Sequence, residues 1–285
     1  MVTALFKVVG LVARVDRKQA QKLAAKLLDH LEARELSVFL EPRLAKYVNR
    51  VEAALPLEEM KTDLIITIGG DGTVLRTCLI IPKPEPPILA INMGVRGFLT
   101  EALPKEGLEA VDKCLKGEFV LQRCMKLASF IGDTRLPDAL NEVFVTADAP
   151  VKLLYAKIWK DGTAVAECRA DGVMVASQVG STGYSLSAGG PVLDPEVDAY
   201  VLTPVCPLLA FRPMVLPAES TISIEVLRPK RAVVVLDGHH RREIEPQNPR
   251  VTITKSEYES SFVRFKDDFY QRLKGRLLFS RGKRR

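Results

Sequence analysis

The sequence predicts an α/β domain followed by a β-rich domain, and three observations support this division. Over about the first hundred residues, apolar runs of strand length alternate with stretches whose apolar residues recur at helical spacing, which is typical of a parallel sheet with flanking helices. From residue 119 to residue 253, short β-rich runs are separated by Gly, Pro and Asp turns, the pattern of a β-sandwich or an irregular β domain. The length of 285 residues is enough for two domains.

The expected elements of the first part alternate along the chain. Strands are expected at Leu5–Val12, Ser37–Leu40, Asp63–Ile68 and Pro87–Ile91. One apolar helix face is formed by Ala20, Leu23, Ala24, Leu27, Leu28 and Leu31, and further helices are expected near 44–55, from about Thr73 and at 106–115. Ligands bind at the carboxyl ends of the strands in such sheets, so we expect a site at that edge.

The second part is expected to be built from strands until near its end. The runs are Asn141–Val145, Val151–Trp159, Val173–Ala176, Ile222–Val226, Val233–Leu236 and Val251–Thr254. Residues 262–278 return to a helical pattern. The change of pattern places the boundary near residue 105, so the expected domains are 1–105 and 106–259.

Charge and composition exclude several classes of protein. Nine basic and two acidic residues from Arg264 onward give a local balance of +7, whereas residues 1–263 carry a net charge of −1. A neutral body with a basic end favours a solvated terminal helix over a nucleic-acid-binding or membrane-binding arm. The five cysteines are scattered, without metal-ligand spacing, so we expect no metal-ligating cluster and a reducing, cytoplasmic setting. Lys7 interrupts the apolar N-terminus, and no secretion signal or membrane span is expected.

The absence of familiar motifs narrows the chemistry further. The chain has no G-x-x-x-x-G-K-[ST] phosphate loop, no G-x-G-x-x-G dinucleotide fingerprint and no G-x-S-x-G nucleophile elbow. Its three histidines, His30, His239 and His240, offer little material for a Ser-His or Cys-His nucleophile.

A glycine-rich loop at Gly69-Gly70-Asp71-Gly72-Thr73 is the most informative feature. It follows an apolar strand and leads into a helix, whose first N–H groups and dipole form a ready anion site. A carboxylate beside bound phosphates is electrostatically unfavourable unless it takes part in catalysis or binds a cation. Asp71 could take a proton from an attacking hydroxyl or hold Mg²⁺. The alternative is a plain strand–turn–helix connection.

A second segment, Gly180–Pro191, reads GSTGYSLSAGGP. Such a density of small and hydroxylated residues around one tyrosine is poor material for a core strand. It suits a close-fitting surface for a sugar–phosphate and a flat ring.

Both segments carry a family resemblance. The first resembles the GGDGT loop shared by NAD kinases, diacylglycerol- and sphingosine-type lipid kinases and, more distantly, 6-phosphofructokinases. The second is similar to the NAD kinase signature T-P-T-G-S-T-A-Y-S-L-S-A-G-G-P. Further motifs in the family's order are Asn141-Glu142, Asn92-Met93-Gly94 with Gly97-Phe98-Leu99, Leu202–Pro207, Phe211-Arg212-Pro213 and Asp237-Gly238. On these motifs the chain is identified as a member of the NAD kinase family.

The resemblance implies phosphorylation of the adenosine-side ribose 2′-hydroxyl of NAD to give NADP, with ATP or polyphosphate as donor and Mg²⁺ or another divalent cation. It also implies a C-terminal β-sandwich that binds NAD, a last segment (260–285) that returns to the first domain, and a homodimer or homotetramer.

The resemblance also implies roles for individual residues. Asp71 would act on the 2′-hydroxyl or organise the donor phosphate. The donor phosphates would be held by Gly69, Gly70, Gly72 and Thr73, with Arg76 on the same helix. Asn141 and Glu142 would hold ribose and adenine groups, and Arg169 and Asp171 would lie near the nicotinamide, either in the same subunit or across a subunit interface. The adenine and ribose cleft would be lined by Ser181, Thr182, Tyr184 and Ser187, and Asp237 would close the site.

Departures from the family pattern leave details of recognition open. Gln178-Val179 stand where the family has Pro-Thr, Gly183 stands where it has Ala, and the segment after Cys206 lacks the usual histidine.

Two alternatives to an NAD kinase remain. A lipid kinase of the diacylglycerol type would share the GGDGT loop, and a non-catalytic dinucleotide sensor would bind NAD without forming NADP.

Overall fold

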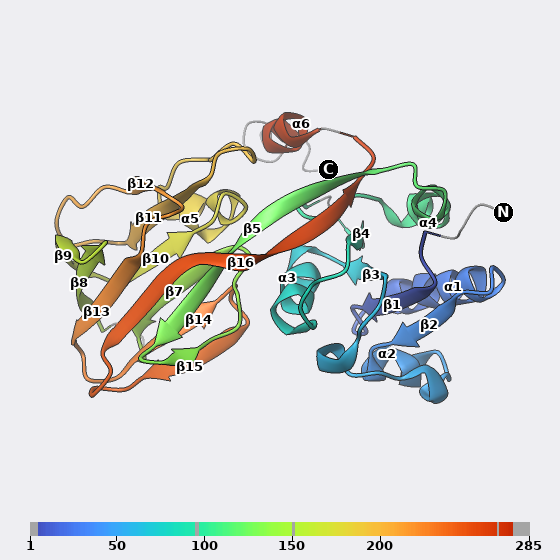
Figure 1. The fold of residues 1–285 in the computed structure, drawn as a ribbon, viewed down its shortest axis with the longest axis horizontal. Helices are drawn as coiled ribbons and strands as arrows, with labels where there is room; N and C mark the ends of the chain where they lie inside the picture. The colour runs from blue at the N-terminus through green and yellow to red at the C-terminus, as the bar shows by residue number, and fades with distance from the viewer. Residues whose placement is uncertain (1–4, 95–96, 150–151, 267, 276–285) are drawn as a thin grey trace, which may run out of the picture. The chain divides into compact units, whose positions relative to one another are not determined.

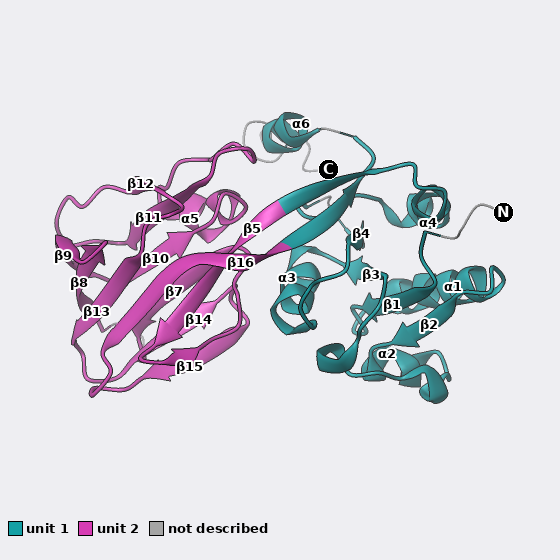
Figure 2. Ribbon diagram, in the orientation of Figure 1, with its two compact units in different colours: residues 1–123, 260–285 teal, residues 124–259 magenta. Residues whose placement is uncertain are grey.

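The computed structural model describes residues 5–94, 97–149, 152–266 and 268–275. It divides into two compact units, which are described separately here. Unit 1 comprises Met1–Arg123 and Ser260–Arg285, and unit 2 comprises Cys124–Glu259 (Figure 2). Among the described residues, no helix has both the length and the apolar character needed to cross a bilayer.

Unit 1 contains a parallel sheet with flanking helices, as the alternating pattern predicts (Figure 1). Its strands lie in the order β2-β1-β3-β4, and the end of β16 pairs with β4 through Phe262 and Ile88. The bounds are β1 Val8–Ala13, β2 Ser37–Leu40, β3 Leu64–Gly69 and β4 Ile88–Asn92. β3 is buried at every position because it lies in the middle of the sheet, which explains its continuous apolar run.

The helices of unit 1 bury the apolar faces that the sequence shows. Their bounds are α1 Lys18–Glu32, α2 Pro42–Tyr47, α3 Asp71–Ile80 and α4 Gly107–Leu115. Leu27 of α1 and Val111 of α4 pack in one core with Leu11 and Ile66 of the sheet. The helix expected near 44–55 is shorter in the structure, because Asn49 takes a left-handed conformation that a continuous helix does not allow.

Unit 2 consists of two antiparallel sheets, in agreement with the expected β-sandwich. One sheet has the order β12-β11-β10-β7-β14-β15, and the other contains β16-β13-β8-β9. The bounds are β7 Glu142–Ala147, β8 Leu154–Lys160, β9 Thr163–Ala170, β10 Gly172–Ala176, β11 Ala199–Val205, β12 Met214–Pro217, β13 Ile222–Arg228, β14 Ala232–Leu236 and β15 His240–Ile244. A short helix, α5 (Tyr184–Ser187), lies in the segment between β10 and β11.

The two units are joined by two long paired strands. β5 (Val120–Ile131) leads into unit 2 and β16 (Arg250–Arg264) leads back, while β6 (Thr134–Arg135) pairs only with β5. Unit 1 extends to Arg123, whereas the sequence places the boundary near residue 105. The difference arises because α4 packs into the core of unit 1.

The C-terminal segment differs from its expected secondary structure. The helix expected over 262–278 is wrong in its first part, because Phe262 and Val263 are fully buried in β16, next to β4. Among the described residues, helix α6 covers Phe269–Leu273 in unit 1, where the last helix is expected to return. The end of the expected helix and the basic cluster Arg281–Arg285 lie outside the described residues.

Candidate active site

The glycine-rich loop lies at the carboxyl end of the central strand of unit 1. Gly69 ends β3, Gly70 is the residue before α3, and Asp71 is the first residue of that helix. A Cβ atom on Gly69 would lie 2.2 Å from Oγ1 of Thr73, so the close approach of strand and helix requires glycine there. The loop therefore presents the positive end of α3 and the Asp71 carboxylate at the edge of the sheet where ligands bind.

The Asp71 carboxylate is held by backbone amides from the segment after β4. The N–H of Phe98 donates to Oδ2 over 3.0 Å, and the N–H of Leu99 donates to Oδ1 over 3.2 Å. A Cβ atom on Gly97 would lie 1.8 Å from Oδ1, so this segment reaches the carboxylate only because residue 97 is glycine. These contacts with Asp71 were not expected from the sequence. The adjacent parallel pairing of β3 and β4, which places Gly69 opposite Asn92, is the feature that explains them.

Gly97→Ala is expected to lower the kcat of the phosphoryl transfer that the resemblance implies by about 100-fold, because a methyl group would displace the Asp71 carboxylate by an ångström or more. The KM for the substrate expected to bind in unit 2 should change little, since the substitution does not alter the residues of that unit. Steady-state kinetics check this result. Gly94→Ala is the matched control, because its Cβ would meet nothing closer than Asn92 Oδ1 at 4.0 Å. Equal kcat values for both variants would contradict the expectation.

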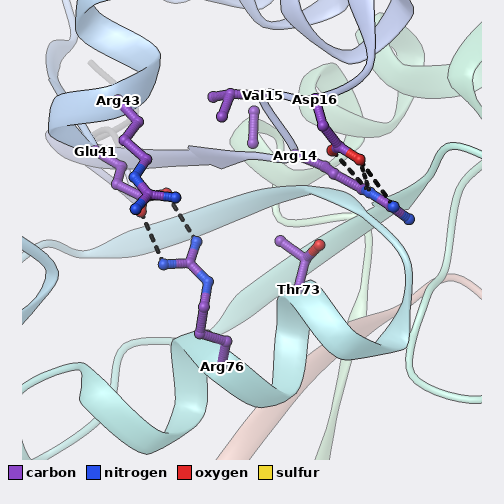
Figure 3. Close-up of a pocket in the computed structure, with 8 residues that line it drawn as sticks. Arg14, Val15, Asp16, Glu41, Arg43, Thr73 and Arg76 are labelled. Atoms are coloured by element: carbon purple, nitrogen blue, oxygen red, sulfur yellow. Dashed lines mark hydrogen bonds and ion pairs between the residues drawn. The ribbon is translucent and has the colours of Figure 1, made fainter. Parts of the chain in front are cut away.

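A cavity of about 470 Å³ opens beside the loop (Figure 3). Its lining combines the residues after β1 and β2 with the first turns of α3: Ala13, Arg14, Val15, Asp16, Glu41, Arg43, Thr73 and Arg76. Arg76 reaches from α3 to Glu41, with both guanidinium–carboxylate bonds at 2.8 Å, and Arg14 pairs with Asp16. Arg43 is exposed. Three guanidinium groups against two carboxylates, with no aromatic ring, leave the lining with a net charge of +1, which suits an extended chain of phosphates better than a base.

Sequence reasoning found Thr73 and Arg76 but missed the other polar residues of this cavity. No sequence motif marks these residues, which are Arg14, Asp16, Glu41 and Arg43. They lie within three residues of the end of β1 or β2, and ligands bind at the carboxyl ends of parallel strands. That rule is the signal that could have found them.

In unit 2, Asp237 fixes the start of β7. Its carboxylate accepts the N–H groups of Leu140 at 2.7 Å, Asn141 at 2.7 Å and Glu142 at 3.0 Å. Asp237 is 4% exposed and has a φ of 50°, in the turn after β14. Its contacts thus orient Asn141 and Glu142.

The second glycine-rich segment lies against the same two residues. A Cβ on Gly180 would lie 1.9 Å from the carbonyl oxygen of Asn141, and one on Gly183 would lie 3.4 Å from Asn141 Nδ2. The structure therefore brings together Asn141, Glu142, Asp237 and the Gly180–Gly183 turn, which are distant in the sequence.

The remaining predicted residues of this segment differ in how far they are exposed to solvent. Ser181 is fully buried, and its hydroxyl donates to the Gln178 carbonyl at 2.6 Å and accepts the Leu193 N–H at 3.0 Å, so it holds the turn together. The Thr182 hydroxyl donates to the Val179 carbonyl at 3.0 Å. Tyr184 and Ser187 are exposed, and the Tyr184 ring packs edge-on against Phe144. Tyr184 is therefore the member best placed to meet a flat ring.

Arg169 and Asp171 lie on the exposed surface at the end of β9 and just after it. The Arg169 guanidinium lies 5.0 Å from the centre of the Tyr155 ring. Burial raises the pKa of the Tyr184 hydroxyl, and the nearby charges of Asp171 and Glu142 add to that rise. The structure thus brings Asp171 near the cluster in unit 2, whereas the Arg169 contact with Tyr155 points to no ligand.

Two polar atoms in this cluster are buried without a hydrogen-bond partner among the described residues, Asn141 Oδ1 and Glu142 Oε2. Buried polar atoms are almost always paired, so such atoms mark a position where a ligand can supply the partner. Burial and, to a lesser extent, the adjacent Asp237 carboxylate together raise the pKa of the Glu142 carboxyl to about 8. Burial also raises the pKa of Asp237, but three amide donors and Lys126 oppose that rise, so Glu142 is the carboxyl that holds a proton.

The raised pKa of Glu142 has a consequence for stability. Between the ordinary value of 4.5 and about 8, the folded protein keeps a proton that the unfolded chain has released. The free energy of unfolding contributed by this group therefore falls as pH rises through that window, by up to about 1.4 kcal/mol per pH unit. Glu142→Gln is expected to flatten the decrease in Tm of the unliganded protein across the same window, measured by calorimetry.

A matched control for this pH dependence is Glu257→Gln. Its carboxyl has a pKa lowered to about 2, chiefly by Arg135, so it does not titrate in the same window. The control should keep the pH slope of the unsubstituted protein. Identical slopes for Glu142→Gln and the unsubstituted protein would contradict the expectation.

Among the described residues, no group of three or more His, Cys, Asp or Glu side chains gathers in a metal-binding arrangement. Near the cavity, Asp16 and Glu41 are each paired with an arginine, and Asp71 is held by amides. Mg²⁺ in phosphoryl-transfer sites uses one or two carboxylates together with the phosphates of the substrate. The carboxylates present fit that mode of binding and do not fit an all-protein metal site.

Comparisons with known proteins agree with this arrangement. The model of the ATP-NAD kinase N-terminal domain matches residues 9–119, and that of the ATP-NAD kinase C-terminal domain matches residues 140–265. A curated NAD kinase of Methanothermobacter thermautotrophicus is 39% identical, with 95% of this chain and 96% of the relative covered. One of Thermococcus kodakarensis is 40% identical, with 92% and 95% covered.

Solved structures are similar as well. An NAD kinase from Archaeoglobus fulgidus in complex with ATP has a TM-score of 0.77 and 31% identity, covering 94% of this chain and 97% of that one. A yeast NADH kinase complexed with NADH shares the fold, with a TM-score of 0.86 at 23% identity, covering 99% and 90%.

Proposed function

The chain belongs to the ATP-NAD kinase family and is a kinase that phosphorylates NAD, and from this premise we propose how its residues share the reaction. The observation that carries the proposal is the Asp71 carboxylate, fixed by two backbone amides at the first turn of α3. A fixed acid at an anion-binding helix end is suited to activating a hydroxyl beside a phosphate chain.

In the proposed step, Asp71 accepts the proton of the ribose 2′-hydroxyl. A carboxylate has two oxygens with two lone pairs each, so a carboxylate that accepts amide hydrogen bonds can also take a proton from a hydroxyl. The hydroxyl oxygen then forms a bond to the terminal phosphorus of the donor, and the bond from that phosphorus to its bridging oxygen breaks. The products are NADP and the shortened donor. Such transfer depends chiefly on positioning and on neutralising charge.

We propose that ATP is the donor and that its phosphates occupy the cavity beside Thr73. Gly69, Gly70 and Gly72 allow the phosphates to approach the backbone, and Arg14, Arg43 and Arg76 supply positive charge. Mg²⁺ would be held by the donor phosphates together with Asp71, and it would neutralise phosphate charge when bound. Polyphosphate would use the same groups.

For NAD, the proposed contacts come from unit 2. Asn141 Oδ1 would accept a hydrogen bond from the adenosine portion. Protonated Glu142 would offer a donor to a ribose oxygen, with Asp237 holding both residues in place. Tyr184 would pack against the adenine ring. Asp171 would lie toward the nicotinamide side, as Arg169 would, either in the same subunit or across a subunit interface.

We further propose that the protein acts in the cytoplasm as a homodimer or homotetramer. Leu208 and Leu209 in the loop after β11 are 60% and 84% exposed, and adjacent apolar side chains at this exposure are typical of a contact surface. Light scattering of the purified protein tests the oligomeric state.

The test of the function is an assay for NADP. The purified protein is incubated with Mg²⁺, with NAD or NADH as acceptor, and with ATP or polyphosphate as donor. NADP formed from NAD and ATP supports the proposal, and the other combinations define the donor and the preferred acceptor. The lipid-kinase alternative is not favoured by the relatives, and a diacylglycerol arm tests it directly. NAD binding without NADP formation would favour a dinucleotide sensor.

A further inference from the structure

Two arginines near the C-terminus are buried in unit 1, far along the sequence from the glycine-rich loop. The side chains of Arg264, at the end of β16, and Arg272, in α6, are 8% and 7% exposed. Both pair with Glu101, whose side chain is 3% exposed, at 3.3 Å and 2.6 Å. Arg272 also pairs with Asp268. Among the described residues, the two arginines lie against the carboxylates of Glu101 and Asp268, and such pairing of opposite charges allows the cluster to be buried.

These arginines also hold the backbone of the segment after β4. Arg264 Nη1 donates to the Leu99 carbonyl at 2.9 Å, and its Nη2 donates to the Phe98 carbonyl at 3.4 Å. Arg272 Nη1 donates to the Phe98 carbonyl at 3.2 Å and the Thr100 carbonyl at 2.9 Å. The rings of Phe98 and Phe269 lie 6.4 Å apart, so α6 packs on the same segment.

The opposite side of this segment contacts Asp71. The peptide group between Phe98 and Leu99 accepts hydrogen bonds from the arginines through its oxygen and donates one to Asp71 through its N–H. A hydrogen bond to the oxygen of a peptide group polarises its N–H and strengthens the bond that the N–H donates. One peptide group therefore links the buried positive charges to the Asp71 carboxylate.

We propose that Arg264 and Arg272 are positioning residues for phosphoryl transfer, acting through the Phe98–Leu99 peptide group to fix the Asp71 carboxylate. This inference rests on the proposed role of Asp71. It assigns the end of β16 and helix α6, which contain none of the predicted site residues, a part in the reaction. A few tenths of an ångström to one ångström of freedom at Asp71 is enough to lower kcat, whereas NAD binding by unit 2 does not depend on it.

The experiment compares Arg272→Met and Arg272→Lys, each made alone and with Asp71→Asn. Arg272→Met is expected to lower kcat by about 10- to 100-fold with an unchanged KM for NAD. Arg272→Lys should restore part of the loss, since an ammonium group can still donate to Glu101 or to one carbonyl. In the Asp71→Asn background, Arg272→Met should cause no further loss, because the group it positions has already been removed.

Arg135→Met serves as the control for the loss of an arginine that forms several ion pairs. Arg135 pairs with Asp138 and Glu257 within unit 2 and has no contact with residues 97–101. Its kcat should equal that of the unsubstituted protein. All assays are run well below the Tm of each variant. If Arg272→Met does not fold, the kcat values of Arg272→Lys and Arg264→Met show whether the arginines position Asp71.

The outcomes separate this inference from the proposed function. If Asp71→Asn retains normal turnover, the role of Asp71 is wrong and the inference falls with it. If Asp71→Asn loses turnover while the variants of Arg272 and Arg264 keep it, only the inference is overturned. A full additional loss from Arg272→Met in the Asp71→Asn background also overturns it, because the arginine would then act independently of Asp71.

Discussion

Asp71→Asn is expected to lower the kcat for NADP formation by about 10²–10⁴-fold, the usual contribution of a positioned general base. The carboxamide has a similar shape, and its oxygen can still accept one of the two amide hydrogen bonds, but it cannot take a proton from the ribose hydroxyl. The affinity for NAD should change little, because the proposed NAD contacts belong to unit 2. Single-turnover kinetics and calorimetric NAD titration measure the two effects separately.

A matched control for this substitution exists in the same unit. Asp63 precedes β3 at its other end, and its Oδ2 accepts the N–H groups of Lys7 at 2.8 Å and Val8 at 2.9 Å. Asp63→Asn therefore removes a carboxylate with a similar pair of backbone bonds, away from the cavity, and should leave kcat unchanged. Near-normal turnover in Asp71→Asn would remove Asp71 from the mechanism.

Asp237→Ala is expected to lower the free energy of unfolding by about 3–5 kcal/mol, because each buried N–H group left without an acceptor costs about 1–3 kcal/mol. The substitution leaves the N–H groups of Leu140, Asn141 and Glu142 without their acceptor. It also places alanine at a φ of 50°, which disfavours side chains other than glycine, asparagine and aspartate. Urea denaturation measures the loss, and the KM for NAD should rise because Asn141 and Glu142 lose their support.

Asp161→Ala separates the cost of the backbone conformation from the cost of the buried contacts. Asp161 has a similar φ of 49° and accepts the Thr221 N–H at 2.8 Å, but it lies in an exposed turn. Its replacement should lower the free energy of unfolding by less than the replacement of Asp237 does. Equal losses for both variants would show that the buried amide contacts of Asp237 contribute nothing.

The candidate site was predictable where its residues are contiguous. The strand, the glycines, the acid and the helix of Leu64–Ile80 form one local unit, because an apolar run and a following glycine pair specify the turn without outside help. The Gly180–Pro191 segment was recognisable in the same way, and so was the family. The sequence did not specify which contacts the individual side chains make. Ser181 is fully buried inside the turn, and the Asp237 carboxylate accepts hydrogen bonds from backbone amides.

The sequence by itself determined the alternating order of unit 1, the change to short β-rich runs in unit 2 and the place of Asp71 in a glycine-rich loop between strand and helix, since periodicity and short motifs are local properties. Only the tertiary structure decided that Phe262 continues a strand, because that depends on the free edge of β4. It likewise decided that Asp71 meets the amides of Phe98 and Leu99 and, through them, two arginines. Such contacts join residues 27 to 174 positions apart, and they form only when sheet pairing and burial bring distant segments to one place.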